Sequence, residues 1–103
     1  MNKKLDKIDH IAIQVSNIQE SVNWYQKKFK CKIIYKDETW AFIQFGNTKL
    51  ALVTNTEHPP HFAILDEKID SNPKATTHRD GSVSIYIKDI DFNFIELIKY
   101  KDK

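Results

Sequence analysis

The sequence has a single cysteine, Cys31, so no disulfide can form within the chain. No histidine is near it in the sequence, and we interpret it as a small buried hydrophobic residue. No apolar run approaches the ~20 residues that a membrane-spanning helix needs. The first residues also lack the apolar core of a signal peptide. These absences predict a cytoplasmic protein in a reducing compartment that does not enter a membrane.

The chain also has little excess charge. Its 103 residues include 16 basic and 14 acidic side chains, which give a formal net charge of +2, and the basic residues are scattered. This balance argues against a nucleic-acid partner. A hydrophobic content of 41% and a charged content of 29% are ordinary for a globular protein. We therefore expect one domain, residues 1–103, whose partner is a small molecule.

The first half of the chain predicts a strand, a helix and three further strands. Residues 8–15 alternate as a strand does, and His10 lies on the opposite face from the main apolar residues. Asn17 is a candidate N-cap for the helix that follows, and Glu20 completes a capping box. The three further strands are predicted at residues 32–36, 40–45 and 49–54.

The second half predicts strands with little helix. Pro59 and Pro60 end the first pattern, because two consecutive prolines cannot continue a central strand. Residues 66–81 are polar and leave room for at most a turn or two of helix. The strands of this half are predicted at residues 61–65, 82–88 and 94–100.

An internal repeat relates the two halves. His10-Ile11-Ala12-Ile13 recurs as His61-Phe62-Ala63-Ile64, 51 residues later, and Leu50-Ala51-Leu52-Val53 matches Ile95-Glu96-Leu97-Ile98, 45 residues later. We therefore predict an α+β fold of two βαβββ-type modules, residues 5–56 and 60–101, with a partly open, curved mixed sheet around a cup. The second module is expected to lack most or all of its helix, and the loss of one strand is left open.

The repeat predicts that His10, His61 and Glu96 face one another from the side that the helix does not cover. Each of these residues alone is more often structural or solvated than a ligand. Together they form a set of two imidazoles and one carboxylate, which suits Fe(II), Mn(II) or Zn(II). A buried carboxylate also needs a cation or hydrogen bonds. We therefore predict a divalent metal site of Fe, Mn, Zn or Ni, with open positions for water or substrate.

Four stretches of the sequence resemble the motifs of one family. The first half opens with IDHIAIQV and the second with HFAI. The segment NIQESVNWY is similar to the motif D-L-x-x-S-x-x-F-Y. The segment HRDGSVSIYIKDIDFNFIEL is similar to the motif H-x-D-G-x-x-S-x-Y-F-x-D-P-D-G-N-x-I-E-L. The family is the vicinal oxygen chelate superfamily, also called the glyoxalase/bleomycin resistance/dioxygenase family. The resemblance spans nearly the whole chain. It implies that His10, His61 and Glu96 occupy metal-ligand positions and that the protein forms a homodimer.

The sequence departs from the family pattern at several positions. The fourth ligand position is Ala51, whereas glyoxalase- and epimerase-like members often have a Glu or Gln there that transfers protons beside a carbonyl. This departure argues against a true glyoxalase I or epimerase reaction and towards extradiol dioxygenases or thiol-transferase fosfomycin resistance proteins. Tyr86 matches a tyrosine of the fosfomycin site, but the C-terminal arginine of that site has no counterpart. Ile90 and Phe92 replace the usual Pro and Gly of the last loop.

Three functions are compatible with these observations. The first is an enzyme of the lyase, dioxygenase or transferase type, in which the metal chelates two oxygens of a small substrate and stabilises developing oxyanion charge. The second is a metal-free protein that sequesters a small aromatic or drug-like molecule, as drug-resistance members of the family do. The third is a scaffold whose site has decayed.

Six further residues are candidates for a role beside the metal. Tyr86 and His78 are the predicted catalytic residues, with His78 acting as an acid or base if its loop folds inward. The alternative role is a structural hydrogen bond or solvent exposure for Tyr86 and Ser84, a loop surface position for His78, and core packing for Trp40 and Phe42. The predicted substrate-binding residues are Gln14, Trp40, Phe42 and Ser84.

Overall fold

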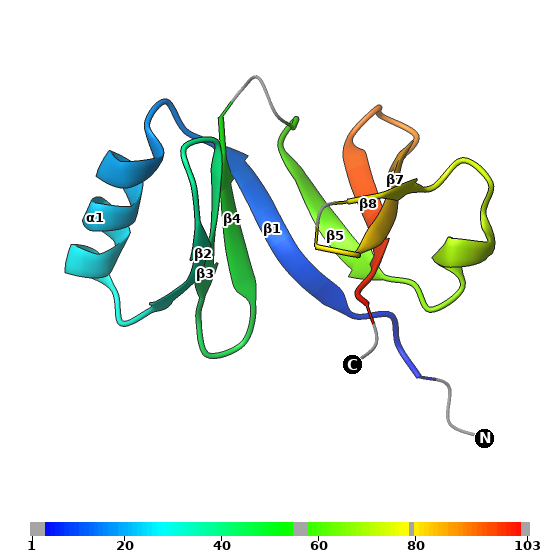
Figure 1. Ribbon diagram of the computed structural model, residues 1–103, viewed down its shortest axis with the longest axis horizontal. Coiled ribbons are helices and arrows are strands. Elements are labelled where there is room, and N and C mark those ends of the chain that lie inside the picture. The colour runs from blue at the N-terminus through cyan, green and yellow to red at the C-terminus, as the bar shows by residue number, and fades with distance from the viewer. Residues whose placement is uncertain (1–3, 55–57, 79, 102–103) are drawn as a thin grey trace. The chain divides into compact units, whose positions relative to one another are not determined.

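The computed structural model describes residues 4–54, 58–78 and 80–101. The described chain divides into two compact units (Figure 1). The N-terminal unit is His10–His61. The C-terminal unit consists of the described residues before His10 and after His61.

The N-terminal unit is a mixed sheet of four strands with one helix. β1 (Ile8–Gln14) pairs in parallel with β4 (Lys49–Val53), and β3 (Trp40–Gln44) joins β4 to β2 (Lys32–Lys36) through antiparallel pairs. The strand order is therefore β2-β3-β4-β1. Helix α1 (Ile18–Lys28) connects β1 to β2 and packs on one face of this sheet (Figure 1).

The start of α1 is the predicted one. The side chain of Asn17 accepts a hydrogen bond from the backbone N–H of Glu20 at 2.9 Å, and this bond satisfies one of the free N–H groups of the first turn. Lys27 and Lys28 lie in the last turn, where the helix dipole favours cations. Both ends of the helix are thus specified by local sequence.

The core of this unit lies between α1 and the sheet. Ile18 and Val22 of the helix pack against residues of β3 and β4, and Val22 and Leu52 are fully buried. Burying a side chain of this size contributes about 1.5–3 kcal/mol. Because successive residues of a strand point to opposite faces, His10 lies on the face that α1 does not cover. The sheet residues of the core are Ala41, Ile43 and Leu52.

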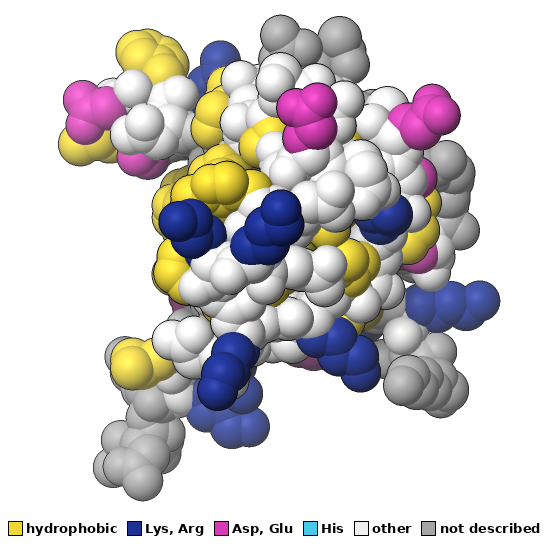
Figure 2. All heavy atoms as spheres, turned by 90° about the vertical axis from the view of Figure 1, so that its left-hand side faces the viewer, with side chains coloured by type: hydrophobic (Ala, Val, Ile, Leu, Met, Phe, Trp, Pro, Cys, Tyr) yellow, Lys and Arg dark blue, Asp and Glu magenta, His cyan; other side chains and the backbone are white. Residues whose placement is uncertain are grey.

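The outer side of α1 presents aromatic rings to solvent. Trp24 and Phe29 are about half exposed, and Figure 2 shows hydrophobic side chains among lysines on this side of the molecule. The ammonium of Lys28 lies 5.9 Å from the ring centroid of Trp24. Cys31 packs against the helix core, with Sγ 3.8 Å from the carbonyl oxygen of Tyr25, but it is only partly buried, whereas the sequence predicted a buried residue.

The C-terminal unit repeats this strand order in a reduced form. Its strands are β5 (His61–Leu65), β6 (Thr76–Thr77), β7 (Val83–Lys88) and β8 (Phe94–Lys99), in the order β5-β8-β7-β6. In each unit the first strand therefore lies beside the last. The strand whose loss was left open is present as β6, although it is only 2 residues long.

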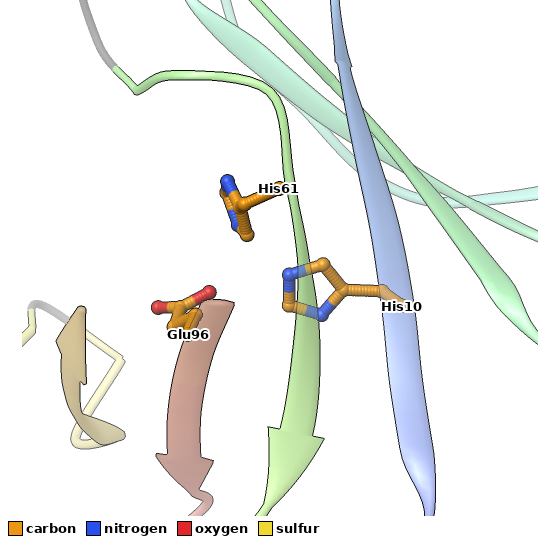
Figure 3. Close-up of side chains that lie close together, drawn as sticks. All are labelled: His10, His61 and Glu96. Atoms are coloured by element: carbon orange, nitrogen blue, oxygen red, sulfur yellow. The ribbon is translucent and has the colours of Figure 1, made fainter. Parts of the chain in front are cut away.

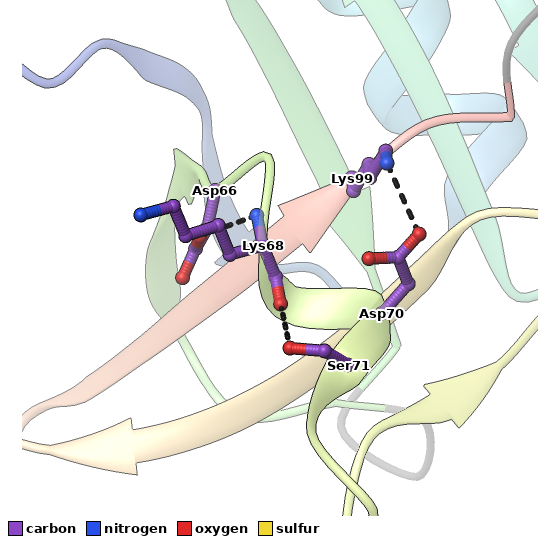
Figure 4. Close-up of polar contacts among 5 residues, drawn as sticks. All are labelled: Asp66, Lys68, Asp70, Ser71 and Lys99. Atoms are coloured by element: carbon purple, nitrogen blue, oxygen red, sulfur yellow. Dashed lines mark hydrogen bonds and ion pairs between the residues drawn. The ribbon is translucent and has the colours of Figure 1, made fainter.

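A single turn stands where the second module would carry its helix. This 3₁₀ turn, η1 (Ile69–Ser71), buries Ile69. The backbone N–H of Lys68 donates to Asp66, the hydroxyl of Ser71 donates to the carbonyl of Lys68, and Lys99 of β8 pairs with Asp70 at 3.0 Å (Figure 4). The predicted loss of most of the helix is confirmed.

The predicted α+β class and its mixed, modular sheets are confirmed, and the predicted strands differ from the observed ones by one residue at some ends. The module limits of 5–56 and 60–101 stay predictions, and residues 55–57 lie outside the described chain. Within the described residues, no helix is long and apolar enough to cross a membrane.

The loop between β7 and β8 holds a strained residue. Phe92 has φ +66°, in the left-handed region that a bulky residue enters at a cost of about 1–2 kcal/mol. It occupies the position where the family motif has Gly. The carboxylate of Asp89 accepts hydrogen bonds from the backbone N–H groups of Asp91 and Asn93, and these bonds hold the loop in this conformation. Ile90 and Phe92 are both exposed.

We expect Phe92→Gly to stabilise the protein by about 0.5–1 kcal/mol, because relief of the left-handed strain exceeds the entropy cost of glycine. Urea unfolding at neutral pH measures the change. Ile90→Gly is the matched control, since it replaces an exposed residue of the same loop that lacks a positive φ, and it should destabilise the protein. Equal destabilisation by the two substitutions would contradict the strain at Phe92.

Candidate metal centre

Two buried histidines lie together in the N-terminal unit. His10 on β1 is 3% exposed and His61 at the start of β5 is 8% exposed. Their ring centroids are 5.6 Å apart, and a ring nitrogen of each lies within 4.8 Å of the other. Two donors on one metal ion, with bonds of about 2.1 Å, lie at most about 4.2 Å apart. The pair therefore needs only a small adjustment to bind one ion.

A hydrogen bond fixes the tautomer of His61. Its Nδ1 lies 2.7 Å from the carbonyl oxygen of Pro59. A carbonyl oxygen can only accept, so Nδ1 must carry the proton. In the neutral ring Nε2 then presents its lone pair, which is the arrangement that metal-binding histidines use.

Gln14 supports this arrangement from the end of β1. Its side-chain amide donates to the carbonyl oxygen of His58 at 3.1 Å. The bond ties the segment that contains Pro59 to the strand that contains His10. Gln14 was predicted to bind substrate, which stays a prediction, and the structure shows that it makes a contact that positions the backbone beside His61.

The aromatic residues of β2 and β3 form a row that leads to His10. Tyr35 and Trp40 are stacked with centroids 4.2 Å apart, and Trp40 meets Phe42 edge to face at 4.8 Å. The Phe42 ring is 5.0 Å from that of His10. Trp40 and Phe42 thus lie outside the helix-covered core, which was their alternative role. Ala51, at the fourth ligand position of the family, is the register partner of Phe42.

Asp37 anchors the start of this row. Its carboxylate accepts hydrogen bonds from the hydroxyl of Tyr35 at 2.5 Å and from the backbone N–H groups of Thr39 and Trp40 at 2.8 and 2.9 Å. Burial raises the pKa of Asp37, but these hydrogen bonds outweigh it and lower the pKa from 3.8 to about 2. Sequence reasoning missed this residue.

The C-terminal unit carries the carboxylate of the predicted ligand set. Glu96 on β8 is 6% exposed and is the register partner of Tyr86 on β7. Figure 3 draws its side chain together with those of His10 and His61, on the strands that carry them. Burial, and then the charge of Glu96, raise the pKa of the Tyr86 hydroxyl above its usual value. Tyr86 therefore remains protonated at neutral pH and can donate a hydrogen bond.

The loop before β7 folds so that His78 reaches the strand. Its Nε2 is 2.6 Å from the hydroxyl oxygen of Ser84, which is 3% exposed. Asp80 accepts from the backbone N–H of Ser82, and Gly81 has φ +87°, where an added Cβ would lie 2.7 Å from a carbon of the Lys101 side chain. These contacts explain why the H-x-D-G-x-x-S pattern needs these residue types. Ser84 shares the face of β7 that carries Tyr86.

Lys49 was also missed by sequence reasoning. It is the register partner of His10 on β4, so both side chains lie on the same face of the sheet. The sequence did contain a signal for the position of Lys49, because Lys49 is two residues before Ala51 and the repeat had already assigned Ala51 to that face.

Comparison with known proteins agrees with the fold. The sequence profile of the Glyoxalase/Bleomycin resistance protein/Dioxygenase superfamily matches residues 7–78. The chain belongs to this superfamily.

Solved structures share the fold at low sequence identity. A hypothetical protein from Bacillus halodurans C-125 is 20% identical, with a TM-score of 0.77 over 97% of this chain and 98% of that one. Methylmalonyl-CoA epimerase from Mycobacterium tuberculosis is 14% identical, with a TM-score of 0.76 over 92% and 88%. A superfamily member from Vibrio splendidus 12B01 is 9% identical, with a TM-score of 0.67 over 91% and 98%.

The hydrogen bonds to Asp37 predict a pH-dependent stability. Its lowered pKa means that this contribution is complete above the unfolded value of about 3.9 and is lost as the pH falls towards 2. Between pH 4 and pH 2 we expect the stability of the wild type to fall more than that of Asp37→Asn. The difference should be a few tenths of a kcal/mol, because solvent screens this site. Urea unfolding across this pH range measures it. Glu38→Gln controls for loss of a neighbouring charge, and parallel profiles for wild type and Asp37→Asn would contradict the assignment.

Proposed function

We propose that this protein is a metal-dependent enzyme in which His10, His61 and Glu96 hold a divalent ion that chelates a small oxygen-bearing substrate. The observation that carries the proposal is the buried pair of histidines, in which His61 has its Nδ1 proton on a backbone carbonyl. A His61 ring whose Nδ1 proton is held by a carbonyl presents Nε2 as a ligand atom, and a ring nitrogen of His10 lies within 4.8 Å of it. The pair is thus suited to share one metal ion.

Glu96 completes the set chemically. It is a buried carboxylate at the repeat position that corresponds to Ala51, and the three side chains together offer two imidazole nitrogens and one carboxylate oxygen. Such a set suits Fe(II), Mn(II), Zn(II) or Ni(II) and leaves positions for substrate. When bound, the metal would act as a Lewis acid on the substrate oxygens.

The protein side chains would orient the substrate and move protons. Tyr86, protonated at neutral pH, is suited to donate a hydrogen bond to a substrate oxygen. His78 is the candidate acid or base, and its bond to Ser84 would hold the ring in one orientation. Ala51 supplies no acid or base at the fourth ligand position. This composition favours a dioxygenase or transferase type of reaction over that of a true glyoxalase I or epimerase.

One observation favours a second function, the binding of a small aromatic molecule without metal. The rings of Tyr35, Trp40 and Phe42, the first two stacked and the last two edge to face, offer an aromatic surface beside His10. Such a surface binds aromatic compounds whether or not a metal is present.

A cytoplasmic location and a homodimer complete the proposal. On the C-terminal unit, η1 covers far less of the sheet than a helix would, and Ile87 of β7 is 42% exposed. Burying such residues against a second copy is the favourable outcome.

The metal content of the purified protein tests the main proposal. We expect about one Mn, Fe, Ni or Zn ion per chain by elemental analysis after gentle purification, and near none in His10→Ala or His61→Ala, because each loses a direct ligand. Glu96→Gln should retain the fold but bind the metal far more weakly. His58→Ala is the matched control, since the His58 ring lies 6.2 Å from that of His61 and is not in the ligand set.

Two results separate the possible functions. Equal metal content in wild type and His61→Ala would overturn the metal site. A metal-free protein that binds an apolar dye, with binding lost in Phe42→Ala, would establish the second function instead.

Gln14→Ala should weaken zinc binding about tenfold without removing a ligand, because outer hydrogen bonds of this kind typically contribute 10–100-fold. The substitution frees the carbonyl segment that fixes Nδ1 of His61. Competition with a chelator of known affinity measures the change. Gln44→Ala serves as the control, because that amide donates to the carbonyls of its own turn; equal weakening in both variants would contradict a positioning role for Gln14.

A further inference from the structure

The C-terminal end of α1 carries a group of aromatic rings that solvent reaches. Trp24 and Phe29 are large apolar side chains, yet each is 51% exposed. Their ring centroids are 6.2 Å apart, and the Phe29 ring also contacts Tyr25 at 6.3 Å and Phe45 at 6.2 Å. These four residues are here called the aromatic cluster. Exposed apolar residues that contact one another, unlike scattered single ones, are typical of an interaction site.

The fold holds this cluster in place. Phe29 is the C-cap of α1, and its backbone N–H donates to the carbonyl oxygen of Tyr25 at 2.9 Å. Tyr25 and Phe45 are partly buried and pack against the core of the N-terminal unit. The exposed rings are therefore supported from below by rings that belong to the core. A partner that binds them loses little affinity to the ordering of side chains.

Lysines adjoin the aromatic cluster. Residues 21–36 contain five lysines and no Asp or Glu. Lys27 and Lys28 lie in the last turn of α1, Lys30 follows it, and all three are exposed. The ammonium of Lys28 lies over the Trp24 ring, 5.9 Å from its centroid, and Figure 2 shows lysines beside hydrophobic side chains on this side of the molecule. The helix dipole favours cations at this end, but it does not account for the exposed rings beside them.

The acidic residues around α1 lie at its other end. Glu20 is in the first turn, which is about 12 Å along the axis from Lys28 at a rise of about 1.5 Å per residue. The side chain of Lys36 donates to that of Gln19, so the end of β2, which Asp37 follows, lies beside the start of α1. Such separations exceed the Debye length of about 8 Å at physiological salt. The C-terminal end of α1 therefore presents a positive surface.

Exposed rings among lysines suit one kind of partner, the surface of an anionic bilayer. Tryptophan is enriched at the level of lipid headgroups, and lysines near that level are attracted to anionic lipids. A second copy of the chain would bring like charges together. Single-stranded nucleic acid stacks its bases on open ring faces. Here Trp24 meets Tyr25 and Phe29 edge to face, with interplanar angles of 80° and 68°, and Lys28 lies over its ring.

We propose that the C-terminal end of α1 binds the surface of an anionic phospholipid bilayer. Trp24 and Phe29 lie at the level of the headgroups, and Lys27, Lys28 and Lys30 lie among the lipid phosphates. The helix has 11 residues, whereas a spanning helix needs ~20, so the protein lies on the membrane and does not cross it. This interaction goes beyond the proposed metal-dependent function and does not depend on it.

Sedimentation with lipid vesicles tests the proposal. Phosphatidylcholine vesicles with about one third phosphatidylserine are compared with vesicles of phosphatidylcholine alone. We expect about a hundredfold tighter binding to the anionic vesicles, because each of three lysines near such a surface contributes about fivefold. Salt at about 1 M should remove the difference. Trp40→Phe leaves Trp24 as the sole tryptophan, and its emission should shift to shorter wavelength with the anionic vesicles only. Equal binding to both kinds of vesicle, or no binding, overturns the proposal.

Variants then assign the binding to α1. Lys27→Gln combined with Lys30→Gln should weaken binding to the anionic vesicles about twenty-fivefold. Lys68→Gln combined with Lys74→Gln is the matched control, because it removes the same charge from exposed positions of the C-terminal unit, and it should bind as wild type does. Trp24→Gln should weaken binding about tenfold through lost apolar contact. Thermal unfolding confirms that each variant is folded, and an equal loss in the two double variants overturns the assignment.

A single-stranded oligothymidylate distinguishes the other polyanionic partner. It should bind far more weakly than the anionic vesicles, and its binding should be the same in Trp24→Gln as in wild type. Tighter binding to the oligonucleotide than to the vesicles, with a loss in Trp24→Gln, would overturn the proposal in favour of nucleic acid. Metal content is measured separately. A protein without metal that binds anionic vesicles supports this proposal although the metal-dependent function fails, and a metal-loaded protein that ignores them does the reverse.

Discussion

The parallel pairing of β1 with β4 is the constraint on which the N-terminal part of the site depends. It fixes the register that sets His10 opposite Lys49 and Ala12 opposite Ala51. Strand alternation then sends the apolar residues of both strands under α1 and the histidine to the other side. A slip of one residue would exchange the two faces and bury the lysine under the helix, so the packing of α1 enforces the register. The packing of the core therefore determines the geometry of this part of the site.

A backbone carbonyl selects the tautomer of His61, which the positions of the strands alone do not determine. Nδ1 of His61 can bond to Pro59 because two prolines end the preceding segment just before β5 begins. Neither proline can donate a backbone hydrogen bond, so the segment offers acceptors only. One of these acceptors selects the histidine tautomer, and the amide of Gln14 holds the adjoining residue. Neighbouring residues outside the proposed ligand set thus hold the ring in the tautomer that metal-binding histidines use.

The sequence predicted the parts of this architecture that depend on periodicity. Alternation located the strands, the Asn17 cap located the start of the helix, and the repeat predicted two βαβββ-type modules. It could not predict contacts that need a three-dimensional register, such as the stacking of Tyr35 on Trp40 or the three bonds to Asp37. Phe92 is intermediate, because the sequence shows that it replaces the family glycine, whereas only the structure shows that its backbone is left-handed and strained.

The loss of a ligand at Ala51 and the presence of Lys49 have the same electrostatic consequence. A divalent ion bound by two neutral imidazoles and one carboxylate keeps one net positive charge, whereas a second carboxylate at position 51 would neutralise it. In this chain position 51 has only the methyl group of alanine. The register partner of Ala51 is Phe42, whose ring is beside that of His10. Lys49 adds a further charge next to that ring. Apolar surroundings lower the local dielectric and strengthen the attraction for an anion. The departure from the family pattern at position 51 would therefore change the charge that a metal ion presents at the proposed site.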